Sequence, residues 1–292
     1  MKLALQKSPI SADQIFEIKS LREPHFDPNW HFHSEYQLFV VLKGTGTRFI
    51  GDHVKPFKEG DLVFTGPDLP HLWRSDPEYF EANPVLYTEG IVIYFHEDFL
   101  GTEFLHKKEL YRIRQLFAKA NQGMEILGSS AIRIKEEMIA LLKLEDFESI
   151  LAFLNILNQL LQTSEYTLLS SDGYTNSLKE LDTERMNKVH AYVMKNFREK
   201  ISLKDVAAIA NMTTSSFSRY FKTHANKTFS DFLTEIRVGY SCKLLIEKNI
   251  NIAQACYESG FHTISNFNRH FKSVTKHSPL AYRKIYNVTQ RN

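Results

Sequence analysis

The C-terminal third of this 292-residue chain repeats one short pattern at an offset of 50 residues. The run FSRYFK at 217–222 recurs as FNRHFK at 267–272. Farther upstream the offset is 49, and the positions that align there are Leu203, Val206 and Ala207 with Ile252, Ala255 and Cys256. Self-similarity at a fixed spacing indicates one supersecondary unit built twice. We therefore expect this region to fold as a tandem pair.

Each copy contains the parts of a helix-turn-helix. Ala207 and Cys256 are small where two helices must cross closely. Asn211 and Gly260 fall at the turn, and both residue types tolerate the positive φ that such a turn usually needs. Residues suited to cap the predicted helices precede them, namely Ser202, Thr213 or Thr214, Asn251 and Thr263.

The second helix of each copy is amphipathic in a way that suits contact with DNA. Aromatic residues take one face, which is predicted to pack inward, and small polar residues with one arginine take the opposite side. Arginine can bond guanine bidentately, asparagine can bond adenine, and lysine can pair with phosphate. The alternative is that these are ordinary amphipathic helices with solvated arginines. Because the same polar face occurs twice, we favour DNA recognition over it. The predicted DNA-contacting residues are Ser215, Ser218, Arg219 and Lys222 in the first copy, and Ser265, Asn268, Arg269 and Lys272 in the second.

The spacing and the charge of this region support the same interpretation. The stretch between the copies, about Phe229 to Glu247, is predicted to be a helix of about 28 Å, at ~1.5 Å per residue. Such a helix can hold two recognition helices about one DNA turn, ~34 Å, apart. Residues 182–292 contain 18 Lys and Arg against 8 Asp and Glu, whereas residues 1–181 contain 18 against 26. A basic segment joined to an acidic one is typical of a nucleic-acid-binding domain attached to another domain.

The run from Ser202 to Lys284 resembles the DNA-binding domain of AraC/XylS-type transcription regulators. The resemblance rests on the two repeated runs, on GF at 260–261 and on PLAYR at 279–283. It adds Ile264 to the base-facing positions. Three positions that are usually glycine in the family are filled otherwise here, by Asn211, Asn226 and Lys276. Lysine with a positive φ would be strained, so Lys276 suggests a different local turn from the family's.

The first third of the chain alternates short β-rich runs with glycine-containing turns. Examples of the runs are 36–42, 47–50, 61–65 and 90–95. Closely spaced short strands with such turns predict a small barrel or sandwich. The sequences WHFHSEYQ at 30–37, KGTG at 43–46 and GDLVFTGP at 60–67 resemble the β-barrel, or cupin, sensor domain that precedes the DNA-binding unit in many such regulators.

Histidines in this domain form the candidate ligand site. On a strand, His31, His33 and Glu35 face one side together, and His71 can join them. Three interpretations stay open: a site for a divalent metal, histidines satisfied by hydrogen bonds in a turn or core, and a polar pocket for an organic ligand.

The cupin pattern disfavours the metal among these three. Its glutamate stands four or five residues after the second histidine, where this chain has Gln37 and Leu38. We therefore predict no bound metal or other cofactor, and an organic effector, for example a carbohydrate stacked on a tryptophan ring. The residues predicted to bind it are Trp30, His31, His33, Glu35, His71 and Trp73.

The pattern between these two regions is helical. Its widest apolar stripe, at 147–161, resembles the family's dimerisation helix, and a helix packed on its own barrel is the alternative. The predicted fold class is α+β multidomain. Its parts are a cupin-like β-barrel sensor domain at 1–97, a helical extension at 98–164, a linker at 165–183 and an all-α tandem helix-turn-helix domain at 184–286.

Features that the sequence lacks narrow the function further. The chain has only two cysteines, no signal-peptide pattern and no apolar run of about 18 residues, so we expect a cytoplasmic protein with no membrane partner. It contains no nucleophile motif, P-loop or GxGxxG fingerprint, and we expect no enzyme. The favoured interpretation is a sequence-specific transcription regulator that responds to a small effector. Its partners would be double-stranded DNA, the effector, a second copy of the chain and, for an activator, RNA polymerase.

Two other classes remain as alternatives. The first is a metal-dependent cupin enzyme with an appended DNA-binding domain. The second is an architectural DNA-binding protein whose barrel holds no ligand.

Overall fold

The computed structural model of the chain describes residues 9–11, 13–81, 85–172, 174, 180–247 and 250–289. Internal contacts divide the chain into two compact units, and the chain passes from the first to the second after residue 176. We call them the N-terminal unit and the C-terminal unit. In the described residues, no helix is both long and apolar enough to cross a lipid bilayer.

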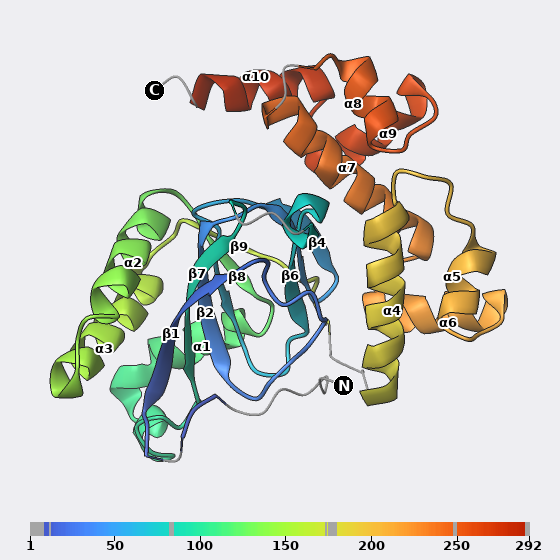
Figure 1. Cartoon of the computed structure of the whole chain (residues 1–292). Coiled ribbons are helices and arrows are strands. Elements are labelled where there is room, and N and C mark those ends of the chain that lie inside the picture. Colours follow the sequence, from blue (N-terminus) through green and yellow to red (C-terminus); the bar gives the residue numbers. More distant parts are fainter. Residues whose placement is uncertain are drawn as a thin grey trace. The chain divides into compact units, whose positions relative to one another are not determined.

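Two sheets build the N-terminal unit (Figure 1). The larger has six antiparallel strands in the order β1-β7-β2-β5-β8-β9, and the smaller has the order β4-β3-β6. This arrangement is the cupin-like architecture that the β-rich runs predict. The strands are β1 (Phe16–Glu23), β2 (Tyr36–Lys43), β3 (Gly46–Ile50), β4 (His53–Phe57), β5 (Leu62–Thr65), β6 (His71–Ser75), β7 (Thr88–Phe95), β8 (Met124–Ile126) and β9 (Tyr166–Leu168).

Strand β2 shows that the larger sheet is buried on both faces. Successive side chains of a strand point to opposite faces. Leu38 and Val40 join the core shared with the helices, whereas Phe39 and Val41 join a second core that also contains residues of the smaller sheet. The middle of the strand, residues 38–42, is therefore apolar without interruption instead of alternating with polar residues.

Three helices cover one face of the larger sheet and are green in Figure 1: α1 (Tyr111–Ala120), α2 (Gly128–Leu141) and α3 (Asp146–Gln162). Some of the apolar side chains of α3 are buried and others are exposed. Phe153 and Leu157 lie in the core, whereas Phe147 and Leu151 are 66% and 52% exposed. One side of this helix therefore packs on its own barrel, and its N-terminal turns present apolar side chains to solvent.

Two short strands lie where the sequence predicts helix or linker. Strand β8 follows α1 inside the helical region, and β9 lies within the stretch 165–183 and pairs with β8. Helix α4 (Glu180–Asn196) also begins inside that stretch, and residues 173 and 175–179 lie outside the described residues.

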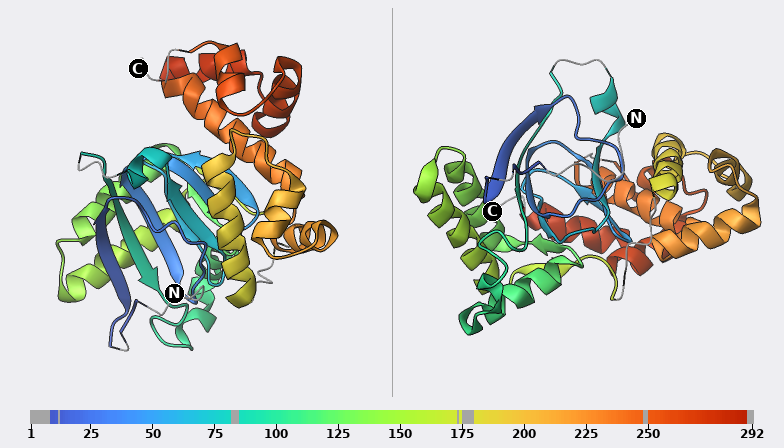
Figure 2. Two further views of the ribbon diagram at one scale, coloured as in Figure 1. Left: turned by 45° about the vertical axis from the view of Figure 1, so that its right-hand side comes forward. Right: turned by 90° about the horizontal axis from the view of Figure 1, so that it is seen from below.

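In the described residues after 177, the C-terminal unit contains helices and no strands. Figures 1 and 2 show α4 to α6 gathered at one end of the long α7 and α8 to α10 at the other. Helix α7 has the bounds that the sequence predicts, Phe229–Glu247. The others are α5 (Leu203–Ile209), α6 (Thr214–Ala225), α8 (Ile252–Glu258), α9 (Ile264–Thr275) and α10 (Pro279–Thr289). The tandem helix-turn-helix prediction is confirmed, with α5–α6 and α8–α9 as its two copies.

The caps and turns explain why these helices begin and end where they do. Ser202 with Asp205, and Asn251 with Gln254, form capping boxes at α5 and α8. The hydroxyl oxygens of Thr213 and Thr263 accept hydrogen bonds from backbone N–H groups in the first turns of α6 and α9.

The residue types at the turns also match the observed backbone conformation, except at Lys276. Asn211 and Gly260 take the positive φ expected between the two helices of each copy. The expectation of a different turn at Lys276 is wrong: its φ is +64°, close to the +53° of Asn226 at the equivalent helix end. Lysine therefore occupies the left-handed conformation here, where glycine would fit without strain.

Candidate DNA-binding surface and histidine cluster

Helices α6 and α9 present the predicted recognition faces. Phe217 and Phe221 on α6, and Phe267 and Phe271 on α9, are fully buried. They fix each helix on its own core, so the opposite face points to solvent. All nine residues predicted to contact DNA are exposed: Ser215, Ser218, Arg219, Lys222, Ile264, Ser265, Asn268, Arg269 and Lys272.

The two exposed faces differ in how their arginine is held. On α9, Nη2 of Arg269 donates a hydrogen bond to Oδ1 of Asn266 at 2.7 Å and lies 3.3 Å from Nε2 of His270. Partial burial, and then the charge of Arg269, lower the pKa of His270, which favours the neutral ring that can accept this bond. The residue of α6 that corresponds to Asn266 is Ser216, whose hydroxyl accepts from Thr213 instead. Asn266 was missed from the sequence, although its i, i+3 spacing from Arg269 is the signal that could have found it.

The second candidate site lies in the N-terminal unit, where three histidine rings meet. His31 pairs with His71 through an isolated β-bridge, which brings the start of β6 beside the segment before β2. Ring centroids are 4.7 Å apart for His31 and His71, and 5.0 Å apart for His33 and His71. Each ring offers a nitrogen within 4.8 Å of the others. In the part of the chain that the structure describes, this trio is the one group of three or more such residues placed to hold a metal ion.

Backbone carbonyls fix the orientation of all three rings. Nδ1 of His31 lies 2.8 Å from the carbonyl of Asn29, and Nδ1 of His71 lies 2.7 Å from that of Leu69. Nδ1 of His33 lies 3.1 Å from the carbonyl of residue 35. A carbonyl oxygen can only accept, so Nδ1 of His31 and of His71 carries the hydrogen and donates it, whereas His33 faces a second acceptor, Oε1 of Gln37, at its Nε2. In the neutral ring, Nε2 then keeps its lone pair, which is the form that binds metals.

His71 has an unsatisfied nitrogen inside the domain. Its side chain is 1% exposed, and its Nε2 has no hydrogen-bond partner. Burial, and then the neighbouring His31 and His33, lower the pKa of His71 well below its usual value. A buried polar atom without a hydrogen bond costs about 1–3 kcal/mol, so this nitrogen marks a place where a ligand would stabilise the protein.

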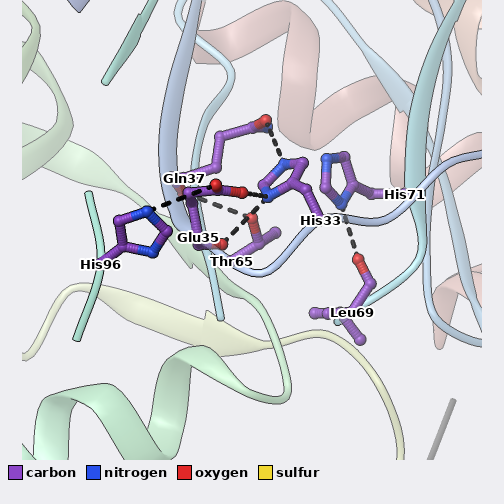
Figure 3. Close-up of polar contacts among 7 residues, drawn as sticks. All are labelled: His33, Glu35, Gln37, Thr65, Leu69, His71 and His96. Carbon is purple, nitrogen blue, oxygen red and sulfur yellow. Dashed lines mark hydrogen bonds and ion pairs between the residues drawn. The ribbon is translucent and has the colours of Figure 1, made fainter. Parts of the chain in front are cut away.

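Glu35 and Gln37 reach different ring nitrogens of His33 (Figure 3). Oε2 of Glu35 is 3.4 Å from Nδ1 of His33, whereas Oε1 of Gln37 is 3.1 Å from Nε2. The expectation that Glu35 shares a face with the histidines assumes a continuous strand, but the chain bends at residues 34–35 before β2 begins. The fully buried Glu35 therefore points to the far side of His33, toward His96, and is not part of the trio.

The two tryptophans predicted to line a ligand pocket are packed in the core. The indole N–H of Trp73 donates to Oδ2 of Asp61 at 3.0 Å, and its ring meets that of Phe39 at a centroid distance of 4.7 Å. Trp30 is 3% exposed and lies edge-on to Phe49. These rings frame the interior near the histidines through packing contacts, and they expose no broad face on which a sugar ring could stack.

Comparisons with known proteins match both units. The helix-turn-helix domain family matches residues 206–285, and the cupin domain family matches residues 21–78. An uncharacterized HTH-type transcriptional regulator, YdeC of Bacillus subtilis (strain 168), is 24% identical over 278 residues, covering 87% of this chain and 86% of its own. The raffinose operon transcriptional regulatory protein RafR of Pediococcus pentosaceus is 27% identical over 261 residues, with coverage of 87% and 86%. The HTH-type transcriptional activator RhaS of Enterobacter sp. (strain 638) is 21% identical, with coverage of 87% for both chains.

Proposed function

We propose that this chain, a sequence-specific DNA-binding transcription regulator of the AraC/XylS type with an N-terminal cupin domain, changes its binding to DNA when the cupin domain takes up a small ligand. The observation that carries the proposal is the unsatisfied Nε2 of His71, buried among two further histidines. A ligand that supplied the missing interaction would favour the protein state that binds it. A carbohydrate or sugar acid is the first organic class to test, because the name of one relative refers to a raffinose operon.

Such a response requires two states of the protein. The ligand must bind one state more tightly than the other, because equal affinity shifts nothing. The chain would then act through binding and without catalysis, in the cytoplasm where its DNA lies. An activator of this kind would also contact RNA polymerase.

We also propose that the chain forms a homodimer through α2 and α3. Soluble proteins seldom leave clustered large apolar side chains exposed without a partner. Burial of this face against a second copy would remove it from water and would place two DNA-binding units on one operator. The exposed apolar side chains on these helices and at the end of α2 are Ile132, Ile139, Leu142, Phe147 and Leu151.

The ligand response can be tested with the full chain and a DNA site obtained by in vitro selection. Thermal shift would screen sugars, sugar acids and aromatic acids, and DNA affinity would then be measured with and without each compound that binds. The proposal predicts a compound that stabilises the wild type and changes its DNA affinity, and that does neither in His71→Gln. DNA affinity that stays the same with every stabilising compound would contradict it.

A control variant separates loss of the ligand site from a general effect of removing a histidine. His106 is exposed in the same unit and lies outside the cluster, so His106→Gln should respond as the wild type does. Circular dichroism of both variants would show that the fold is kept.

A further inference from the structure

The chain stays bound to the barrel after β9, in the stretch that the sequence predicts to be a linker. We call residues 169–172 and Tyr174 the strap. The first two amides of the strap, at 169 and 170, donate hydrogen bonds of 3.0 and 2.8 Å to carbonyl groups of the turn between α1 and β8. The third, that of Ser171, donates to Oδ1 of Asp52 in the turn between β3 and β4, at 3.0 Å. The strap therefore ties the start of the linker to two turns of the N-terminal unit.

Two side chains of the strap belong to the core that residues of both sheets share. Leu169 is a buried member of that core, and the ring of Tyr174 packs against it. Gly51 leaves the room that this packing needs, because a Cβ added there would lie 2.9 Å from Cβ of Ser170 and 3.1 Å from the ring of Tyr174. Most other buried side chains of this core come from strands, which their sheet hydrogen bonds hold in place.

The strap also lies next to a residue that holds the histidine cluster. A Cβ added at Gly123 would lie 3.4 Å from side-chain carbons of both Leu69 and Leu169, so these two side chains flank the same glycine. The carbonyl of Leu69 accepts the hydrogen bond from Nδ1 of His71. Because protein interiors are close-packed, a ligand beside His71 needs room that other side chains must give up. The strap lies outside the strands, so it can leave the core at a lower cost than a strand can.

The far end of the linker is bound to the recognition helix α6. The phenol of Tyr220 donates a 2.6 Å hydrogen bond to the backbone carbonyl of Asp182, in the first turn of α4. Burial, and then the charge of Asp182, raise the pKa of Tyr220, so the phenol keeps the proton that it donates. Tyr220 is the neighbour of Arg219, a predicted DNA contact. Residues 175–181 alone separate Tyr174 from Asp182, so a change at the strap can act on α6 through a short piece of chain.

We propose that the strap is a regulatory contact: while it is bound to the barrel it restrains α6 through the linker and the bond from Tyr220 to Asp182, and its release raises the affinity for DNA. The bound and the released strap are then the two states that a ligand response requires. Ligand uptake by the barrel releases the strap, and this step alone rests on the proposed function.

Hydrogen exchange and DNA affinity of strap variants of the full chain test the proposal without any ligand. In Tyr174→Ala, the amides of Leu169, Ser170 and Ser171 should exchange about 10-fold faster than in the wild type. A duplex obtained by in vitro selection should bind this variant about fivefold more tightly, at the lower end of typical coupling between two sites. Tyr111→Ala is the matched control, since Tyr111 is 57% exposed on α1, and it should behave as the wild type does. Wild-type exchange or wild-type affinity in Tyr174→Ala would overturn the proposal.

A second pair of variants reaches the strap without removing a side chain from it. Gly51→Ala brings a Cβ against the strap, whereas Gly60→Ala also places alanine at a positive φ but with nothing within 4 Å. Gly51→Ala should therefore reproduce the faster exchange and the tighter binding of DNA, and Gly60→Ala should show neither. Equal behaviour of the two variants would overturn the role of the strap.

Tyr220→Phe tests the route to α6, because it removes only the hydroxyl group that binds Asp182. If the strap acts through that bond, Tyr174→Ala should change the affinity for DNA much less in the Tyr220→Phe background than in the wild type. Additive effects of the two substitutions on that affinity would overturn this route.

Compounds from the thermal-shift screen separate this inference from the proposed response. A compound that raises the affinity for DNA and speeds the exchange of the three strap amides supports both. A compound that changes the affinity and leaves this exchange as it was supports the response and overturns release of the strap as its route. Strap variants that bind DNA more tightly, when no compound changes the affinity, support the strap and contradict the response.

Discussion

Nη2 of Arg269 lies 2.7 Å from Oδ1 of Asn266, one turn earlier on the same exposed face of α9. The bond holds a flexible, charged side chain in one orientation before DNA is bound. Orientation of this kind lowers the entropy that is lost when the guanidinium binds a base. The equivalent pair on α6, Arg219 and Ser216, has no such bond, because the serine hydroxyl is used at the helix cap.

Asn266→Ala should therefore weaken specific DNA binding by about 0.5–1.5 kcal/mol, the contribution of one hydrogen bond. Ser216→Ala is the matched control and should leave the affinity nearly unchanged. Fluorescence anisotropy with a selected duplex and with a scrambled one would measure both. A loss in Ser216→Ala as large as that in Asn266→Ala would contradict this role of Asn266.

Gly260→Ala should destabilise the C-terminal unit by more than the free-energy cost of placing alanine at a positive φ. Gly260 has a φ of +84°, and an added Cβ would lie 2.8 Å from the carbonyl oxygens of Phe197 and Arg198. Gly60 has nearly the same φ, +85°, but open space around it. Gly60→Ala therefore measures the cost of the φ angle, about 1–2 kcal/mol, and Gly260→Ala should exceed it by at least about 1 kcal/mol. Chemical denaturation followed separately for each unit would test this, and equal losses would contradict it.

Lys276→Gly should stabilise the protein by about 1 kcal/mol, because it relieves the left-handed conformation at the end of α9. The matched substitution Lys272→Gly lies inside the same helix and should destabilise by about 1 kcal/mol. Thermal melts without DNA would compare the two variants. A melting temperature of Lys276→Gly below that of the wild type would show that the lysine is not strained there.

Leu151→Glu should shift the chain from dimer to monomer, because it places a charge within the proposed interface on α2 and α3. Tyr257→Glu is the control, since Tyr257 is 57% exposed and lies on α8, outside that face. Sedimentation velocity would report the oligomeric state over a range of concentrations. A wild type that stays monomeric, or a Leu151→Glu chain that stays dimeric, would contradict the proposed interface.

Local signals explain which parts of the fold the sequence predicts. The caps at Ser202, Asn251 and Thr263, and the turns at Asn211 and Gly260, are set by residues within three positions of one another. Such features need no knowledge of the tertiary fold. The repeat then doubles each signal, which is why the C-terminal unit and its exposed recognition faces could be predicted.

Tertiary contacts explain what the sequence does not predict. Strands β8 and β9 have three residues each, too few for a period-2 pattern, and they exist because they extend the edge of a sheet that is already formed. Glu35 points away from the histidine trio because the chain bends at residues 34–35, so an alternation argument fails there. Trp73 is held by Asp61, the residue before β5, a pairing that spacing along the chain does not reveal.

The central claim is that α6 and α9 each read part of one DNA site, and in vitro selection from random duplexes tests it most directly. The wild type should enrich a motif of two blocks about one helical turn apart, roughly 10 base pairs. Arg219→Ala should lose the sequence preference of one block only, and Arg269→Ala that of the other, with the fold unchanged by circular dichroism. Selection of the full wild-type motif by both variants, or no enrichment by the wild type, would contradict the claim.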